Sequence, residues 1–168
     1  MRRAILAFII PALFLAAYGV KVLPWTIAYN RTDSLPLGLY LERMNPPPLE
    51  RGQLACFRYQ EPRWAAGRYL PNGAQICKEV LGLPGDSIRQ ESEKLTLAHD
   101  GETVSLGTLL PADSKGRPIP PMQWGTTVIP AGKYYLGSTR IVTSFDSRYL
   151  GLVDQGDVVG RIYPLYTF

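Results

Sequence analysis

The sequence has few charged residues, and they are not clustered. Its 168 residues carry a net charge of +4, and only 19% of them are charged. Lysines and arginines are scattered along the chain, so the sequence offers no concentrated basic patch that would bind nucleic acid. It also has no internal repeat and no low-complexity block. A chain of this length suits one domain with an appendage.

The composition gives little support to long helices. The chain contains 16 glycines and 15 prolines, and 46% of its residues are hydrophobic. Such a loop-rich composition is more typical of an irregular β protein than of a helical one. We therefore expect a mainly β protein with no long helix beyond the N-terminus.

The N-terminus holds the one long apolar run. Two arginines precede an apolar stretch from Ala4 to Val20, which places the N-terminus in the cytoplasm and sends the rest of the chain across the membrane. A stretch of ~17 residues is at the lower limit for a span, and Trp25 extends it to the interface. We expect a retained transmembrane anchor over residues 1–25, followed by a periplasmic domain over residues 26–168.

A cleavable signal peptide is the alternative interpretation of this run. Tyr18 and Lys21 do not suit the end of such a peptide, where small residues precede the cleavage site, and this favours the anchor. Both interpretations put the globular part outside the cytoplasm. Residues 25–33 are mixed and polar, and they fit a short emergence from the membrane surface.

A single lysine interrupts an apolar segment in the middle of the chain. Residues 76–81 read Ile-Cys-Lys-Glu-Val-Leu and are followed by the turn Pro84-Gly85-Asp86, which predicts a buried strand. A lysine in an apolar setting loses the solvation of its ammonium group, so its pKa falls and it becomes a candidate general base. The alternative is that Lys78 lies on the solvent face of an edge strand.

Two polar loops are the other informative segments. Ser34 lies among hydroxyl, proline and glycine residues that predict a turn, and nucleophiles often lie on such loops. Taken alone, Ser34 would be interpreted by default as an ordinary turn serine. Residues 144–148 read Ser-Phe-Asp-Ser-Arg and suit a polar cluster beside a buried site. For Asp146 and Arg148, an ordinary ion pair in a turn is the alternative.

Taken in order, these segments resemble the type I signal peptidase family of serine–lysine peptidases. A Ser-x-Pro loop follows the anchor, Gly-x-Pro-Gly-Asp follows the lysine, and Ser-x-Asp-Ser-Arg-x-x-Gly comes last. The resemblance covers most of residues 30–166. Segments 34–40, 144–149 and 160–166 are most similar to the TraF branch, the conjugative-transfer signal peptidases. The Ser-Met and Pro-Thr pairs of general leader peptidases are absent.

The resemblance implies a serine endopeptidase whose mechanism uses no histidine. Ser34 aligns with the family nucleophile and Lys78 with its general base. The only histidine, His99, lies in a stretch that carries no motif. We expect neither a metal nor another cofactor.

The resemblance also assigns supporting roles. Thr32 matches a hydroxyl that helps the nucleophile's own amide to stabilise the oxyanion. Ser144 matches a serine that orients the lysine, and Asp146 and Arg148 match its polar support. Glu79 departs from the family, which often has a basic residue there, but strand alternation directs its side chain away from the lysine.

The expected fold is a coiled antiparallel β-sheet domain with an N-terminal transmembrane helix, in the bacterial inner membrane. The resemblance implies membrane-tethered precursors as substrates, with small residues near the cut. For the TraF branch the substrate is a pilin precursor, and some members also join the new ends into a cyclic peptide. The expected partners are this precursor, inner-membrane lipid and conjugation-machinery proteins, without nucleic acid. A general signal peptidase and a catalytically silent membrane-anchored assembly factor are the alternatives.

The two cysteines suggest a disulfide. An extracytoplasmic location exposes Cys56 and Cys77 to an oxidising compartment, and each lies in a predicted strand. We predict a bond between them, closing a loop of about twenty residues that would contribute ~3 kcal/mol. Two small buried residues that never meet are the alternative.

Overall fold

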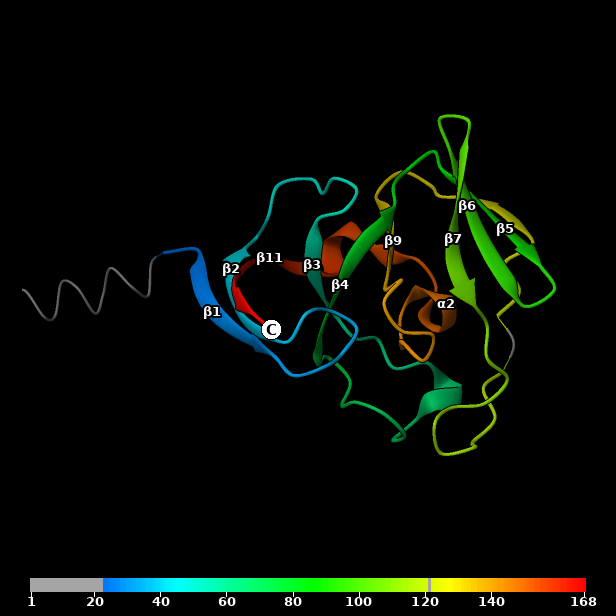
Figure 1. Ribbon diagram of the computed structural model, residues 1–168, viewed down its shortest axis with the longest axis horizontal. Coiled ribbons are helices and arrows are strands. Elements are labelled where there is room, and N and C mark those ends of the chain that lie inside the picture. The colour runs from blue at the N-terminus through cyan, green and yellow to red at the C-terminus, as the bar shows by residue number, and fades with distance from the viewer. Residues whose placement is uncertain (1–22, 121) are drawn as a thin grey trace, which may run out of the picture.

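The computed structural model describes residues 23–120 and 122–168, which form eleven strands and three short helices (Figure 1). Four strands lie in the first half of this region: β1 (Trp25–Asn30), β2 (Gly38–Met44), β3 (Leu54–Arg58) and β4 (Gln75–Gly82). The next four are β5 (Ser87–Glu91), β6 (Lys94–His99), β7 (Glu102–Thr108) and β8 (Thr126–Val128). The last three are β9 (Lys133–Gly137), β10 (Val153–Asp154) and β11 (Val158–Thr167). The helices are the 3-10 turns η1 (Arg63–Ala65) and η2 (Gln155–Asp157) and the α-helix α2 (Ser147–Leu150).

The strands form two antiparallel sheets. The larger sheet has the order β1-β2-β11-β3-β4-β9-β10, and the smaller has the order β7-β6-β5-β8. Figure 1 shows the larger sheet curling away from β1, with the smaller sheet at the opposite end of the molecule. The prediction of a mainly β, coiled antiparallel fold is confirmed.

β4 is the strand predicted from the apolar segment around Lys78. Its side chains alternate between buried and partly exposed positions, and Ile76, Lys78 and Val80 are on the buried face. The following turn closes as expected, because the Asp86 carboxylate accepts a hydrogen bond of 2.6 Å from the Leu83 amide. The prediction of a buried strand is therefore confirmed.

The described residues contain three clusters of buried hydrophobic side chains. The first lies at the smaller sheet and includes Ile88. The second lies beneath β3 and β9, and β4 contributes Ile76 and Val80 to it. The third includes Leu35, next to Ser34, and Cys56. Close packing in the second cluster holds β4 in place in the interior of the domain.

Residues 25–30, at the start of the described region, form β1 because they pair with β2 from Trp25↔Arg43 to Asn30↔Gly38. That residues 25–33 emerge from the membrane surface stays a prediction. The anchor predicted over residues 1–25 lies outside the described residues except for its last three. Across residues 23–120 and 122–168, no helix is long and apolar enough to cross a membrane.

Cys56 and Cys77 form a disulfide, which confirms the predicted bond. The two residues lie directly opposite each other in the pairing of β3 with β4, and their Cα atoms are 3.9 Å apart. The bond fixes β3 to β4 one residue before Lys78.

We expect the double variant Cys56→Ala, Cys77→Ala to lose ~3 kcal/mol of unfolding free energy, because the unfolded chain is no longer constrained by the loop between the cysteines. Urea unfolding of the purified full-length protein in detergent, followed by circular dichroism, measures this loss. A reductant should destabilise the wild type and leave the double variant unchanged. Identical unfolding of both proteins without reductant would contradict the prediction.

Candidate active site

Part of β4 borders an open cavity. β4 pairs with β3 from Gln75 to Glu79, whereas β9 pairs with β4 only from Glu79 onward. Within the described residues, positions 75–78 therefore have a free outer edge. A cavity of about 570 Å³ lies there, and we call it the β4 cavity. Its apolar lining includes Ala28, Tyr40, Ile76, Ile141, Phe145 and Ile162.

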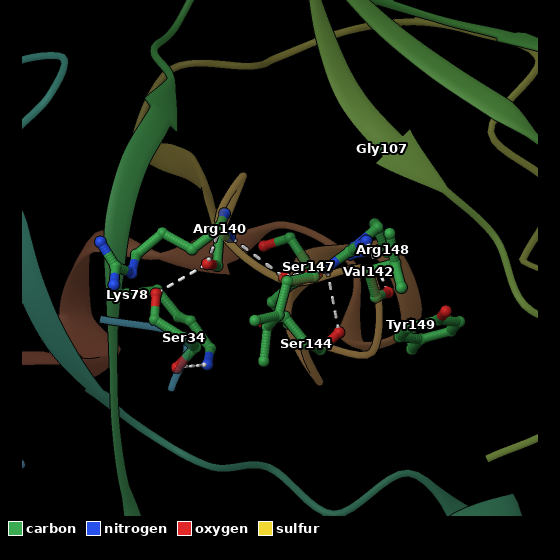
Figure 2. Close-up of polar contacts among 12 residues, drawn as sticks. Ser34, Lys78, Gly107, Arg140, Val142, Ser144, Ser147, Arg148 and Tyr149 are labelled. Carbon is green, nitrogen blue, oxygen red and sulfur yellow. Dashed lines mark hydrogen bonds and ion pairs between the residues drawn. The ribbon is translucent and has the colours of Figure 1, made fainter. Parts of the chain in front are cut away.

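Ser34 and Lys78 meet in the wall of the β4 cavity. The Lys78 ammonium donates a hydrogen bond of 2.6 Å from Nζ to Ser34 Oγ, and Figure 2 shows the two side chains next to each other. Both residues are buried, with exposed fractions of 3% for Ser34 and 5% for Lys78. Lys78 comes from β4 and Ser34 from the turn between β1 and β2, so the fold brings together two residues that sequence motifs had singled out separately.

The turn that carries Ser34 is held by side-chain donors at its carbonyl groups. Asn30 Nδ2 donates to the carbonyls of Thr32, Leu35 and Pro36 over 2.9, 3.1 and 3.0 Å. The Tyr40 hydroxyl donates to the Pro36 carbonyl over 2.6 Å. Such bonds fix the turn and with it the position of the Ser34 hydroxyl.

Ser138 holds the nucleophile's own carbonyl. Its hydroxyl donates to the Ser34 carbonyl oxygen over 2.7 Å, and its amide donates to Asp146 Oδ2 over 3.2 Å. Ser138 directly follows β9 and is only 2% exposed. Sequence reasoning missed it, because nothing in the local sequence indicates that the end of β9 lies against a turn 104 residues earlier.

Burial lowers the pKa of Lys78 from 10.5 to about 8, since removing water from the ammonium group favours the neutral amine. The Asp146 carboxylate opposes this change, and the Arg148 guanidinium reinforces it. Glu79, the departure from the family pattern, follows Lys78 in the strand and so lies on the other face. The Lys78 amine is thus available as a base near neutral pH.

Two hydrogen-bond donors lie beside the Ser34 hydroxyl. Thr32 Oγ1 is 3.4 Å from Ser34 Oγ and donates to Asn30 Oδ1 over 2.9 Å. The Ser34 amide has no acceptor among the hydrogen bonds of the described region. The Ser34 amide is thus without an acceptor, whereas the Thr32 hydroxyl is used on Asn30 in this structure, and the oxyanion role of both stays a prediction.

Asp146 and Arg148 form a buried ion pair. Their exposed fractions are 0% and 1%, and Arg148 Nη2 lies 2.8 Å from Asp146 Oδ2. Arg148 also donates to the carbonyls of Val142 and Ser144, over 3.1 and 3.2 Å. Arg148 is a residue of α2, and Figure 2 shows its side chain next to Val142. The hydrogen bonds of Arg148 hold the loop before α2 in place. Asp146 accepts a hydrogen bond from the Ser138 amide, and the Ser138 hydroxyl in turn donates to the Ser34 carbonyl.

Ser144 lines the β4 cavity, as the motif suggests. Its hydroxyl is buried and has no hydrogen-bond partner in the part of the chain that the structure describes. It therefore makes no bond to Lys78 in this structure, and its predicted role in orienting the lysine stays a prediction.

His99 lies away from this site. It ends β6 in the smaller sheet, where its ring contacts Asp86 and Asp100 at 3.1 and 3.2 Å. Over residues 23–120 and 122–168, no three histidine, cysteine or acidic side chains converge in a way that could hold a metal ion.

Comparisons with known proteins agree with this geometry. The model of the family "Signal peptidase, peptidase S26" matches residues 1–166. The conjugal transfer protein TraF of Agrobacterium fabrum is 32% identical over 99% of this chain and 98% of its own length. The plasmid transfer protein TraF of Escherichia coli is 29% identical over 91% of this chain and 87% of its own length.

Similarity to signal peptidases is more distant. Signal peptidase I V of Bacillus subtilis is 29% identical over 55% of this chain and 58% of its own length. A solved signal peptidase I from Enterococcus faecalis is 20% identical, covers 70% of this chain and 98% of its own, and superposes with a TM-score of 0.40. The match of the family model over nearly the whole sequence, together with the TraF relatives, shows that this chain belongs to the signal peptidase family, peptidase S26.

Proposed function

We propose that this protein is a membrane-anchored serine endopeptidase that removes signal or leader peptides from exported precursors, with Ser34 as nucleophile and Lys78 as general base. The observation that carries the proposal is the 2.6 Å contact between Ser34 Oγ and Lys78 Nζ, in a site whose burial lowers the pKa of Lys78 to about 8. A serine hydroxyl needs such an adjacent base to become a nucleophile.

The reaction follows serine–lysine chemistry. Neutral Lys78 takes the Ser34 hydroxyl proton as Oγ attacks the scissile carbonyl carbon. The oxyanion accepts a hydrogen bond from the Ser34 amide and a second from the Thr32 hydroxyl, which first turns away from Asn30 Oδ1. The carbon–nitrogen bond then breaks, and Lys78 returns the proton to the leaving amine. Water, deprotonated by Lys78, hydrolyses the acyl-enzyme and releases Ser34.

The free edge of β4 supports binding of an extended substrate. On the edge of β4 that faces away from β3, positions 75–78 have no strand partner within the described region, so a peptide can add to this edge as a further strand. A peptide bound along β4 passes Lys78, and this path brings one of the peptide's carbonyl groups next to Ser34. The apolar lining of the cavity suits small apolar side chains.

Within this function we propose that the substrate is a conjugative pilin precursor, presented at the periplasmic face of the inner membrane to a domain anchored by residues 1–25. Relatives named as conjugal and plasmid transfer proteins along nearly the whole chain support this choice. Cyclisation of the product requires only that an amine reaches the acyl-enzyme before water. Conjugation-machinery proteins are the proposed partners.

Two alternatives are separable by assay. A general signal peptidase would cleave ordinary secretory precursors as readily as pilin precursors. A silent assembly factor would cleave neither, although a binding role does not require a buried lysine beside a serine.

Ser34→Ala, Lys78→Ala and Lys78→Arg should each abolish cleavage of a purified pilin precursor. The first lacks the nucleophile, and the other two lack a base, because a guanidinium remains protonated. Gel analysis of precursor and product in detergent micelles measures this, with circular dichroism to check folding. Full processing by any of the three folded variants would refute the dyad.

The rate of cleavage should rise with pH through about 8, the pKa of Lys78. Below this pH the ammonium cannot accept the hydroxyl proton, and the rate falls ~10-fold per pH unit; above it the rate reaches a plateau. Initial rates at saturating precursor, from about pH 6 to about pH 10, measure the profile. A flat profile over this range would exclude a lysine base.

Ser138→Ala should lower kcat ~10-fold with little change in KM, because one buried hydrogen bond that positions the nucleophile is lost. The midpoint of the pH profile should not move, since Lys78 keeps its surroundings. Ser105→Ala is the matched control, because this exposed serine lies in β7, in the smaller sheet. A wild-type kcat in Ser138→Ala would show that the bond to the Ser34 carbonyl does not position the nucleophile.

A further inference from the structure

A buried carboxylate lies beside the β4 cavity and has no role in the proposed chemistry. Glu42 is 4% exposed, and it lies on the same face of β2 as Tyr40, which lines the cavity. Among the described residues no basic group comes within ion-pairing distance of it. Burial raises the pKa of this carboxyl, and a hydrogen bond from Gln75 opposes the rise. An unpaired buried carboxylate destabilises a fold, so its presence at the cavity calls for an explanation.

The neighbouring strand is shaped to hold this side chain. Gly160 in β11 lies two residue pairs away from Glu42 along β2, opposite Met44. A Cβ atom at position 160 would overlap the Glu42 carboxylate. The absence of a side chain at Gly160 therefore lets the carboxylate lie across β11, toward the side of the sheet that carries β3 and β4.

The carboxylate fixes a side chain that lines the cavity. Gln75 Nε2 donates to Glu42 Oε1 over 2.7 Å, and Gln75 is one of the residues of the cavity wall. Because Nε2 is bonded to the carboxylate, the Gln75 Oε1 atom is the group left to interact with a ligand. This oxygen accepts no hydrogen bond within the described residues. It is an exposed acceptor with a negative charge directly behind it, in a wall that combines apolar side chains with polar ones such as Arg31 and Thr143.

The position of Gln75 relates this acceptor to the reacting bond. Gln75 lies three residues before Lys78 on the free edge of β4, and three strand residues cover about 10 Å. A substrate strand along this edge therefore places a side chain near Gln75 about three residues from the scissile bond.

We propose that Gln75, held by Glu42, is a specificity-determining residue that selects precursors with a hydrogen-bond-donating side chain about three residues from the cut. This inference rests on the proposed peptidase function and defines its substrate class. Side chains such as glutamine supply the donor, an apolar side chain of equal size leaves the acceptor unpaired, and glutamate is repelled by Glu42. A site built to pair with a polar group discriminates strongly against partners that lack it.

The test uses precursor peptides that differ only in carrying Gln, Met or Glu at one position. Separate series place the change two, three or four residues from the cut, on each side. For full-length wild-type enzyme in detergent, we expect kcat/KM in one series to be ~10-fold higher for Gln than for Met, and lower still for Glu. In Gln75→Met the ratio between the Gln and Met peptides should fall to ~1. In Glu42→Gln, kcat/KM for the Glu peptide should rise toward the value for the Met peptide.

The outcomes separate this inference from the proposed function. If the wild type cleaves no peptide, or cleaves no better than Ser34→Ala, the peptidase function itself fails. If the wild type cleaves all three peptides equally in every series, the proposed peptidase function is supported, and the proposed selectivity of Gln75 is overturned. The wild-type preferences decide this even where a variant does not fold. A folded Gln75→Met enzyme that keeps the full preference would show that another residue makes the selection.

Discussion

The burial of one ammonium group is the constraint on which the rest of the site depends. A pKa lowered from 10.5 to about 8 means that the surroundings destabilise the Lys78 ammonium, relative to the neutral amine, by ~3 kcal/mol. The fold tolerates this because β4 is packed between core clusters and tied to β3 by a disulfide. The fold thus loses stability at one residue, and part of the Lys78 amine is neutral close to physiological pH.

The remaining polar groups limit how far this effect goes. Asp146 favours the ammonium form and Arg148 disfavours it, so an ion pair beside the lysine has opposing influences on its charge. Both partners are almost fully buried, and their main bonds go to backbone groups of the loop before α2. The Asp146–Arg148 pair therefore contributes more to the shape of the site than to the electrostatic potential at Lys78.

Short sequence patterns predicted the features that depend on neighbouring residues in the chain. The strand around Lys78 was evident from an apolar segment followed by a Pro-Gly-Asp turn. The cysteine pair followed from compartment and strand positions. The roles of Ser34 and Lys78 came from the resemblance, since each motif alone had an ordinary interpretation. Ser138, Gln75 and Glu42 could not be found, because their contacts join strands far apart in the sequence.

The position of β11 has a consequence for the order in which the domain folds. This last strand lies between β2 and β3, and so it separates the half of the sheet that carries Ser34 from the half that carries Lys78. Contacts between distant parts of a chain form slowly, because the loop between them must close first. Until β11 has inserted, no strand joins β2 to β3 in the larger sheet. The last residues to be synthesised are therefore the ones that bring the halves with Ser34 and Lys78 into one sheet.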